Sequence, residues 1–147
     1  MKKIILIPLL LLGAYYSPAQ DIAENQLPSL VRNSFQKTFP KASDVDWEMD
    51  GSHFKVEFET GLFGTDHHAW FDQSGKLLRH KEAIAKSELP AAVRSKLSKE
   101  FSAYRTDDID KITEGSAITY NIELKSFSGK WKAVFDSTGR VLDKRAD

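Results

Sequence analysis

The sequence contains no cysteine among its 147 residues. This absence excludes a disulfide framework, a cysteine-based zinc site, a thiol nucleophile and a lipidated N-terminal cysteine. The sequence also lacks an excess of either charge, because 21 lysines and arginines balance 21 aspartates and glutamates. A balanced chain has no basic footprint for nucleic acid, so we expect no nucleic-acid partner. Its length and its 11% aromatic content instead predict one folded domain with a core.

The N-terminus carries the pattern of a secretion signal. Lys2 and Lys3 precede an apolar run over residues 4–12, and small residues stand just before Gln20. We therefore predict a signal peptide over residues 1–19. The apolar run is much shorter than the roughly 20 residues that a membrane-spanning helix needs, so we expect no membrane span after signal removal. The predicted location is periplasmic or extracellular.

The rest of the sequence contains an internal repeat. Residues 27–32 reappear as residues 89–94 at an offset of 62, and from Asp44 onward the offset is 64 without a gap. The identical pairs over that stretch are Asp44/Asp108, Asp46/Asp110, Gly51/Gly115, Ser52/Ser116, Glu59/Glu123, Phe63/Phe127, Ala69/Ala133, Phe71/Phe135, Asp72/Asp136, Gly75/Gly139 and Leu78/Leu142. We predict that residues 20–147 form a single domain made of two repeats, about 24–82 and 86–145.

Apolar residues at helical spacing open each repeat. They are Leu27, Val31 and Phe35 in the first repeat and Leu89, Val93, Leu97 and Phe101 in the second. A recurrence every fourth residue places these side chains on one face of a helix. The pattern predicts an amphipathic helix near residues 28–39 and its copy in the second repeat.

Two β-hairpins are predicted after each helix. Alternating apolar and polar residues flank the Asp-Gly dipeptide at residues 50–51, which is typical of a two-residue turn. Such a turn would place Trp47 opposite Phe54 and Val45 opposite Val56. All four apolar side chains would then lie on one face of the hairpin.

A second turn at residues 72–75 completes the pattern, because Asp72 and Gly75 suit a type I turn with a bulge. The predicted fold class is α+β. We expect a tandem duplication of a helix plus four-stranded antiparallel unit, with the helices packed on one face of the sheet and the other face in contact with water. Phe71 and Phe135 should be buried equivalents in the two repeats.

These features together resemble a known family. A leading Leu-Pro helix, a strand that ends in Phe-Asp-x-x-Gly, the duplication and the secretion signal resemble the secreted PepSY-like proteins of Bacteroidetes, whose fold is similar to the beta-lactamase inhibitor protein. The resemblance covers about residues 24–145. It implies a periplasmic or extracellular protein that is not an enzyme, with suggested roles in restraining proteases or binding other proteins.

The sequence offers no recognisable catalytic motif, and no serine lies in a Gly-x-Ser-x-Gly pattern. The one cluster that resembles metal ligands comprises His53, Asp66, His67, His68 and His80. Adjacent residues of a strand point to opposite faces, so His67 and His68 cannot bind one ion together in a regular strand. We therefore predict no catalytic residue, no cofactor and no metal. We interpret the histidines as surface residues, except that the alignment of His67 with Trp131 favours a packing or rim role for His67.

Two functions stay open at this point. One is a protein-interaction or inhibitory module whose exposed sheet face binds an unidentified protein partner. The other is a carrier of a small ligand or metal with a pocket between helix and sheet. The candidate protein-binding surface consists of Trp70, His68, His53 and Lys55. Trp70 would be a large aromatic among polar residues, as at an interface anchor, unless it packs on Leu77 or Leu78 of the next strand.

Overall fold

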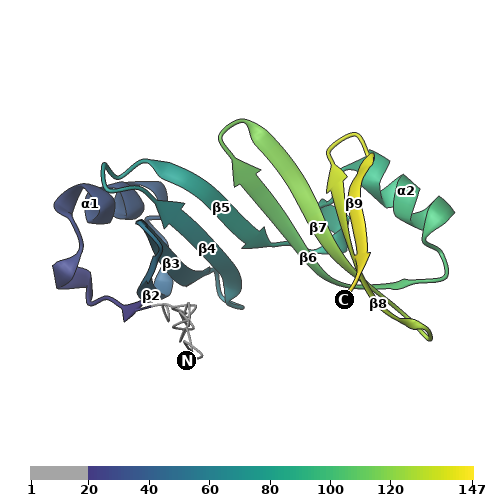
Figure 1. Cartoon of the computed structure of the whole chain (residues 1–147), viewed down its shortest axis with the longest axis horizontal. Helices are drawn as coiled ribbons and strands as arrows, with labels where there is room; N and C mark the ends of the chain where they lie inside the picture. Colours follow the sequence, from purple (N-terminus) through teal and green to yellow (C-terminus); the bar gives the residue numbers. More distant parts are fainter. Residues whose placement is uncertain (1–19) are drawn as a thin grey trace, which may run out of the picture.

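The computed structural model describes residues 20–147, and the predicted signal peptide over residues 1–19 lies outside them. One antiparallel sheet contains nine strands in sequence order (Figure 1). The strands are β1 (Gln20–Asp21), β2 (Ser43–Asp50), β3 (His53–Thr60), β4 (Thr65–Phe71), β5 (Leu77–Ala83), β6 (Arg105–Glu114), β7 (Ala117–Ser126), β8 (Gly129–Asp136) and β9 (Val141–Ala146). The helices are α1 (Ser29–Thr38) and α2 (Ala91–Glu100), each preceded by a short 3₁₀ turn, η1 (Glu24–Gln26) or η2 (Lys86–Glu88). No helix within residues 20–147 is long and apolar enough to cross a membrane.

The predicted fold class, an α+β tandem of helix plus four-stranded units, is wrong. The described chain is mostly a single antiparallel sheet, and its two α-helices contain only 10 residues each. Strand β1, which the sequence analysis missed, adds a ninth strand at one edge. Strands β5 and β6 pair from His80↔Thr113 to Ala83↔Asp110. The sheet therefore continues without a break from the first half of the molecule, which contains β1 to β5 and α1, to the second half, which contains α2 and β6 to β9. Sequence periodicity did not reveal this because it identifies strands but not which of them pair.

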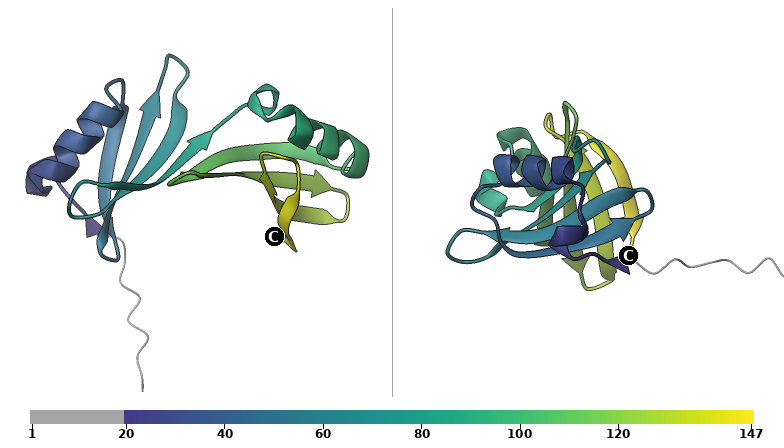
Figure 2. Two further views of the ribbon diagram at one scale, coloured as in Figure 1. Left: turned by 90° about the horizontal axis from the view of Figure 1, so that it is seen from above. Right: turned by 90° about the vertical axis from the view of Figure 1, so that its left-hand side faces the viewer.

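Both helices lie on the same face of this sheet. Directly opposed residues of antiparallel strands point to the same side of the sheet. Val56 lies opposite Ala69, Ala69 opposite His80, and His80 opposite Thr113 of β6, so all four side chains point to one side. That side carries the apolar core under α1 and, farther along, the core under α2. Figure 2 shows α1 and α2 at opposite ends of the strongly twisted sheet. We call the opposite side the helix-free face.

Each helix covers its own hydrophobic core. Val31 and Phe35 of α1 pack with the side chains of β2, β3 and β4, while Val93 and Leu97 of α2 pack with those of β6, β7 and β8. The predicted equivalence of Phe71 and Phe135 in burial is confirmed, because both side chains are 0% exposed. In the described chain these are two separate clusters of buried residues, one under each helix.

The predicted pairing of the first hairpin is also wrong. Trp47 lies opposite Val56, because the turn consists of residues 51–52 rather than 50–51. The new pairing shifts each strand partner by two residues, so Trp47 and Val56 still share the core face. Val45 does not join them: a bulge near Asp44, whose φ is 49°, leaves Val45 37% exposed at the edge of the sheet.

Candidate functional site

Three of the four predicted surface residues meet on the helix-free face. Lys55 of β3 lies directly opposite Trp70 of β4, and His68 lies opposite Glu57 on the same pair of strands. The rings of His68 and Trp70 are stacked, with their centroids 6.1 Å apart. This cluster forms because alternate residues of two paired strands project to one side of the sheet.

Lys55 is the centre of an ionic network. Its Nζ donates to Glu48 Oε1 at 2.6 Å and to Glu57 Oε1 at 2.7 Å, and His68 Nδ1 lies 3.1 Å from the same Glu57 oxygen. Burial acts to lower the pKa of Lys55, but the hydrogen bonds to Glu48 and Glu57 outweigh burial and raise it. The hydrogen bond from Lys55 in turn lowers the pKa of Glu57. Burial lowers the pKa of His68, which favours its neutral form despite the neighbouring Glu57.

The half-buried indole of Trp70 has polar neighbours on three strands, β2, β3 and β5. Its Nε1 donates to Asp50 Oδ2 at 2.8 Å. The Arg79 guanidinium lies over the ring, 4.9 Å from its centroid, and Lys55 Nζ lies 5.9 Å away. Cations over an aromatic face are attracted by its quadrupole, so the two charged side chains hold the ring in one orientation.

The sequence analysis missed Arg79 and Asp50 as neighbours of Trp70. A bulge between Trp70 and Phe71 shifts the register, so that Arg79 rather than Leu78 lies opposite Trp70. A slip of one residue exchanges the two faces of a strand, which is why the turn alone could not identify this neighbour. His53, the fourth predicted residue, lies exposed at the start of β3 opposite Asp50 and outside the network.

The remaining histidines lie on the helix side of the sheet. His67 is 6% exposed, in line with the packing role that its alignment with Trp131 favours. Its Nδ1 lies 3.0 Å from His80 Nε2, and its Nε2 lies 2.8 Å from Thr60 Oγ1. The ring also stacks on Phe58 at a centroid distance of 4.9 Å. Burial lowers the pKa of both His67 and His80, and the nearby His67 lowers that of His80 further.

Within residues 20–147, the group of acidic or histidine ligand atoms close enough to share a metal ion is Asp107, Asp108 and Glu123. None of the five residues that resemble metal ligands in the sequence belongs to it. Lys125 pairs with Asp107 and places its Nζ 3.3 Å from Glu123 Oε1. The cluster therefore already holds a cation of the chain's own.

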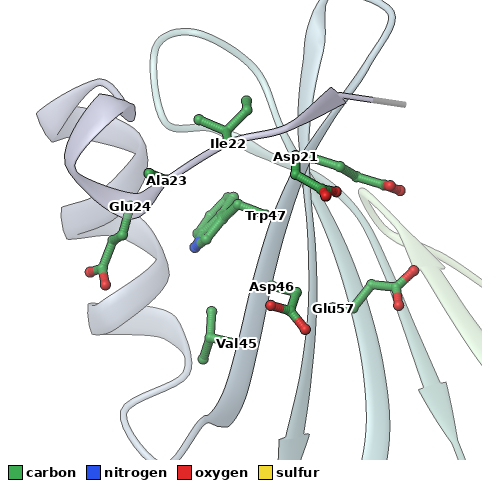
Figure 3. A pocket seen from close by; sticks show the side chains of 9 residues that line it. Asp21, Ile22, Ala23, Glu24, Val45, Asp46, Trp47 and Glu57 are labelled. Atoms are coloured by element: carbon green, nitrogen blue, oxygen red, sulfur yellow. The ribbon is translucent and has the colours of Figure 1, made fainter. Parts of the chain in front are cut away.

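A cavity of about 640 Å³ opens at the edge of the sheet where β1 meets β2 (Figure 3). Five carboxylates line it, those of Asp21, Glu24, Asp46, Glu48 and Glu57. Ile22, Ala23, Val45 and Trp47 supply the apolar part of the wall. Figure 3 shows the carboxylates of Asp46 and Glu57 projecting from the helix-free side of the strands. This acidic edge cavity suits a cationic group rather than an anion.

A second hollow, of about 400 Å³, lies where β4, β5 and β6 adjoin. Its lining includes His68 and Lys81 together with Asp66 and Asp110, and Lys81 Nζ lies 3.2 Å from Asp110 Oδ2. The hollow thus connects the Trp70 cluster of the first half with the second half of the sheet. Residues from both halves line it because β5 pairs with β6.

Comparison with known proteins finds one matching family model. A family model described as "Putative beta-lactamase-inhibitor-like, PepSY-like" matches residues 16–78 and, a second time, residues 52–143. No curated protein matches the chain.

Solved structures of Bacteroides proteins share the fold. A DUF2874 family protein from Bacteroides uniformis has a TM-score of 0.70 at 22% sequence identity, over 81% of this chain and 88% of that one. A structure from Bacteroides eggerthii, described as "putative periplasmic proteins", has a TM-score of 0.71 at 21% identity, over 82% of this chain and 88% of that one. A BLIP-like protein from Bacteroides fragilis has a TM-score of 0.70 at 17% identity, over 82% and 86%.

Proposed function

Because the chain belongs to the PepSY-like, beta-lactamase-inhibitor-like family, we propose that it is a periplasmic, non-enzymatic module that binds another protein through its helix-free face. The description of the Bacteroides eggerthii protein as periplasmic supports the location. The observation that carries the proposal is the position of Trp70, a large aromatic on the open side of a sheet whose other side is closed by two helices.

The surroundings of Trp70 have the composition of an interface. An aromatic anchor with a guanidinium over its ring and a rim of ion pairs is the combination that protein interfaces favour at their centre and edge. Lys55, Glu57 and Arg79 are already fixed by contacts within the chain. A partner would therefore meet a preorganised surface and lose little side-chain entropy on binding.

One end of the helix-free face is acidic, and this charge bears on the partner's chemistry. The acidic edge cavity lies at the β1–β2 end, and Asp46, Glu48 and Glu57 belong both to its lining and to the helix-free face. A partner that covers Trp70 and extends to this edge would bring basic side chains there. The space between each helix and the sheet is filled by core side chains, so this region gives the alternative of a carrier no support.

The experiment compares Trp70→Ala with Leu30→Ala, a control on the helix side whose side chain is 60% exposed. Each purified variant is used to capture proteins from a periplasmic extract, and candidates are then titrated by calorimetry. We expect a partner that binds wild type and Leu30→Ala equally. Trp70→Ala should bind it about thirtyfold more weakly, the effect of losing an interface hot spot.

The denaturation midpoint of each variant is measured alongside. Because Trp70 is half-buried, Trp70→Ala should remain folded. If the folded Trp70→Ala variant captures every partner with wild-type affinity, the helix-free face is not the binding surface and the proposal fails.

A further inference from the structure

Three aromatic rings surround one ammonium group on the helix side of the second half. Lys144 Nζ lies 4.8 Å from the ring centroid of Trp131, 5.3 Å from that of Phe101 and 5.5 Å from that of Tyr104. We call these three residues the aromatic cage. The cage is built from three elements, because Phe101 caps α2, Tyr104 lies in the turn before β6, and Trp131 belongs to β8.

The cage is rigid. Phe101 is 7% exposed and meets the buried Phe135 edge to face, at a centroid distance of 5.8 Å. The backbone N–H of Tyr104 donates to the Phe101 carbonyl at 3.0 Å, which fixes the second ring beside the first. Trp131 and Tyr104 are half-buried and pack against the α2 core. The rings therefore keep their positions whether or not a cation lies between them.

Lys144, by contrast, is held loosely. It is an exposed residue of the edge strand β9. The carboxylates of Asp143 and Asp147 are engaged by Arg145 and Lys132, and Lys144 forms no ion pair within residues 20–147. An exposed cation–π contact contributes only about 0.5–1 kcal/mol, so this side chain can leave the cage at small cost.

The first half shows that the fold does not need an ammonium at this position. By the sequence offset, Trp131 corresponds to His67 and Lys144 to His80. In the first half, His67 and His80 contact each other directly, with His67 Nδ1 3.0 Å from His80 Nε2. The cage of the second half is thus a distinct feature, and its chemistry is that of a cation receptor.

We propose that the aromatic cage binds a quaternary ammonium group, which replaces the ammonium of Lys144. Several ring faces that converge on one point attract a cation through their quadrupoles, and such cages are the usual receptors for quaternary ammonium ligands. A primary ammonium such as that of lysine is strongly hydrated and loses more on entering an apolar cage. A trimethylammonium group has no N–H to leave unsatisfied there, so it has the advantage over the resident lysine.

The test follows the three tryptophan indole N–H signals by NMR while choline chloride is added to residues 20–147. Sodium chloride controls for ionic strength, and 3,3-dimethylbutan-1-ol is the uncharged analogue of choline. We expect choline alone to shift the Trp131 signal in a saturable manner. Lys144→Ala should tighten choline binding about two- to fivefold, because it removes the competing ammonium. Trp131→Leu should abolish binding.

Two results would overturn the proposal. One is a Trp131 shift that is the same for choline, sodium chloride and the uncharged analogue. The other is a choline affinity that is unchanged in Lys144→Ala. Lys144→Ala keeps the test decisive if Trp131→Leu is too unstable to study, since Lys144 is exposed and its truncation leaves the core intact.

Discussion

At the scale of single residues, the buried imidazole of His67 makes the stability of the first half depend on pH. Burial is the main cause of its lowered pKa, and the neighbouring charges of Glu82 and Asp66 only partly oppose it. His80 shares this property, and the two rings contact each other through nitrogen atoms. Protonation of both rings would place two positive charges 3.0 Å apart inside the fold.

We predict that the free energy of unfolding falls as the pH drops below 6.5, the ordinary histidine pKa. Above that pH both states hold neutral imidazoles, and the full stability is present. Below it the unfolded state takes up protons that the folded state, with its lowered pKa, does not bind, so unfolding becomes easier. Urea denaturation between pH 7.5 and pH 5, as a rough range around this pKa, measures the effect.

The matched variants are His67→Phe and His53→Gln. His67→Phe removes one of the two contacting imidazoles and should make the pH dependence of stability shallower, whereas His53→Gln, at an exposed position, controls for the loss of one histidine. An equally steep profile in His67→Phe would mean that other groups control the acid sensitivity.

At the scale of elements, the turns between β4 and β5 and between β8 and β9 are docking points for the helices. A Cβ atom on Gly75 would lie 2.5 Å from the Leu30 carbonyl oxygen of α1, and one on Gly139 would lie 2.8 Å from the Ala92 oxygen of α2. Both glycines also have positive φ, 82° and 83°. The sequence motif predicted the turns, but the backbone contact with the helix depends on the packing of distant segments.

We predict that Gly75→Ala destabilises the protein more than Gly51→Ala. Both positions have positive φ, so each alanine costs about 1–2 kcal/mol in backbone strain. A Cβ atom on Gly51 would meet nothing within 4 Å, whereas one on Gly75 meets the Leu30 carbonyl, and forcing atoms into a packed site costs about 1–3 kcal/mol more. Thermal and urea denaturation of the two variants measures the difference in stability. Equal losses of stability in both variants would show that the backbone of α1 moves aside at no cost.

At the scale of the whole molecule, one sheet joins two hydrophobic cores. Phe71 and Phe135 are fully buried, each in the core under its own helix. The only sheet contact between the halves is the pairing of β5 with β6, among the strands that the structure describes. The two cores are therefore coupled through this strand pair and through the ion pairs across it, Arg79–Glu114, Lys81–Asp110 and Lys111–Glu82.

We predict that Phe71→Ala and Phe135→Ala each lower the free energy of unfolding by about 3–5 kcal/mol, the usual cost of removing a buried phenylalanine ring. Because the two side chains share no buried neighbour, the double variant should lose the sum of the two within about 0.5 kcal/mol. Denaturant titration of the four proteins completes the cycle. A deviation above 1 kcal/mol, about twice the additive error, would indicate one coupled core.

Local sequence patterns were sufficient to locate most of the elements and to identify what fills the cores. Spacing of four residues placed Val31 and Val93 on the buried sides of helices, and alternation placed Trp47 and Val56 on the buried side of a hairpin, as the structure confirms. The helix and strand periods translate directly into which side chains share a face, so no knowledge of distant contacts was needed. The family resemblance depended on the same local motifs and is confirmed by the family match.

The way the strands join and the surroundings of Trp70 emerged only from the folded molecule. The pairing of β5 with β6 makes one sheet of nine strands, and the bulge after Trp70 brings Arg79 opposite its ring. The aromatic cage around Lys144 likewise assembles from α2, the following turn, β8 and β9. Strand pairing and register depend on contacts between residues far apart in sequence, and a shift of one residue exchanges the faces of a strand, so periodicity alone does not specify them.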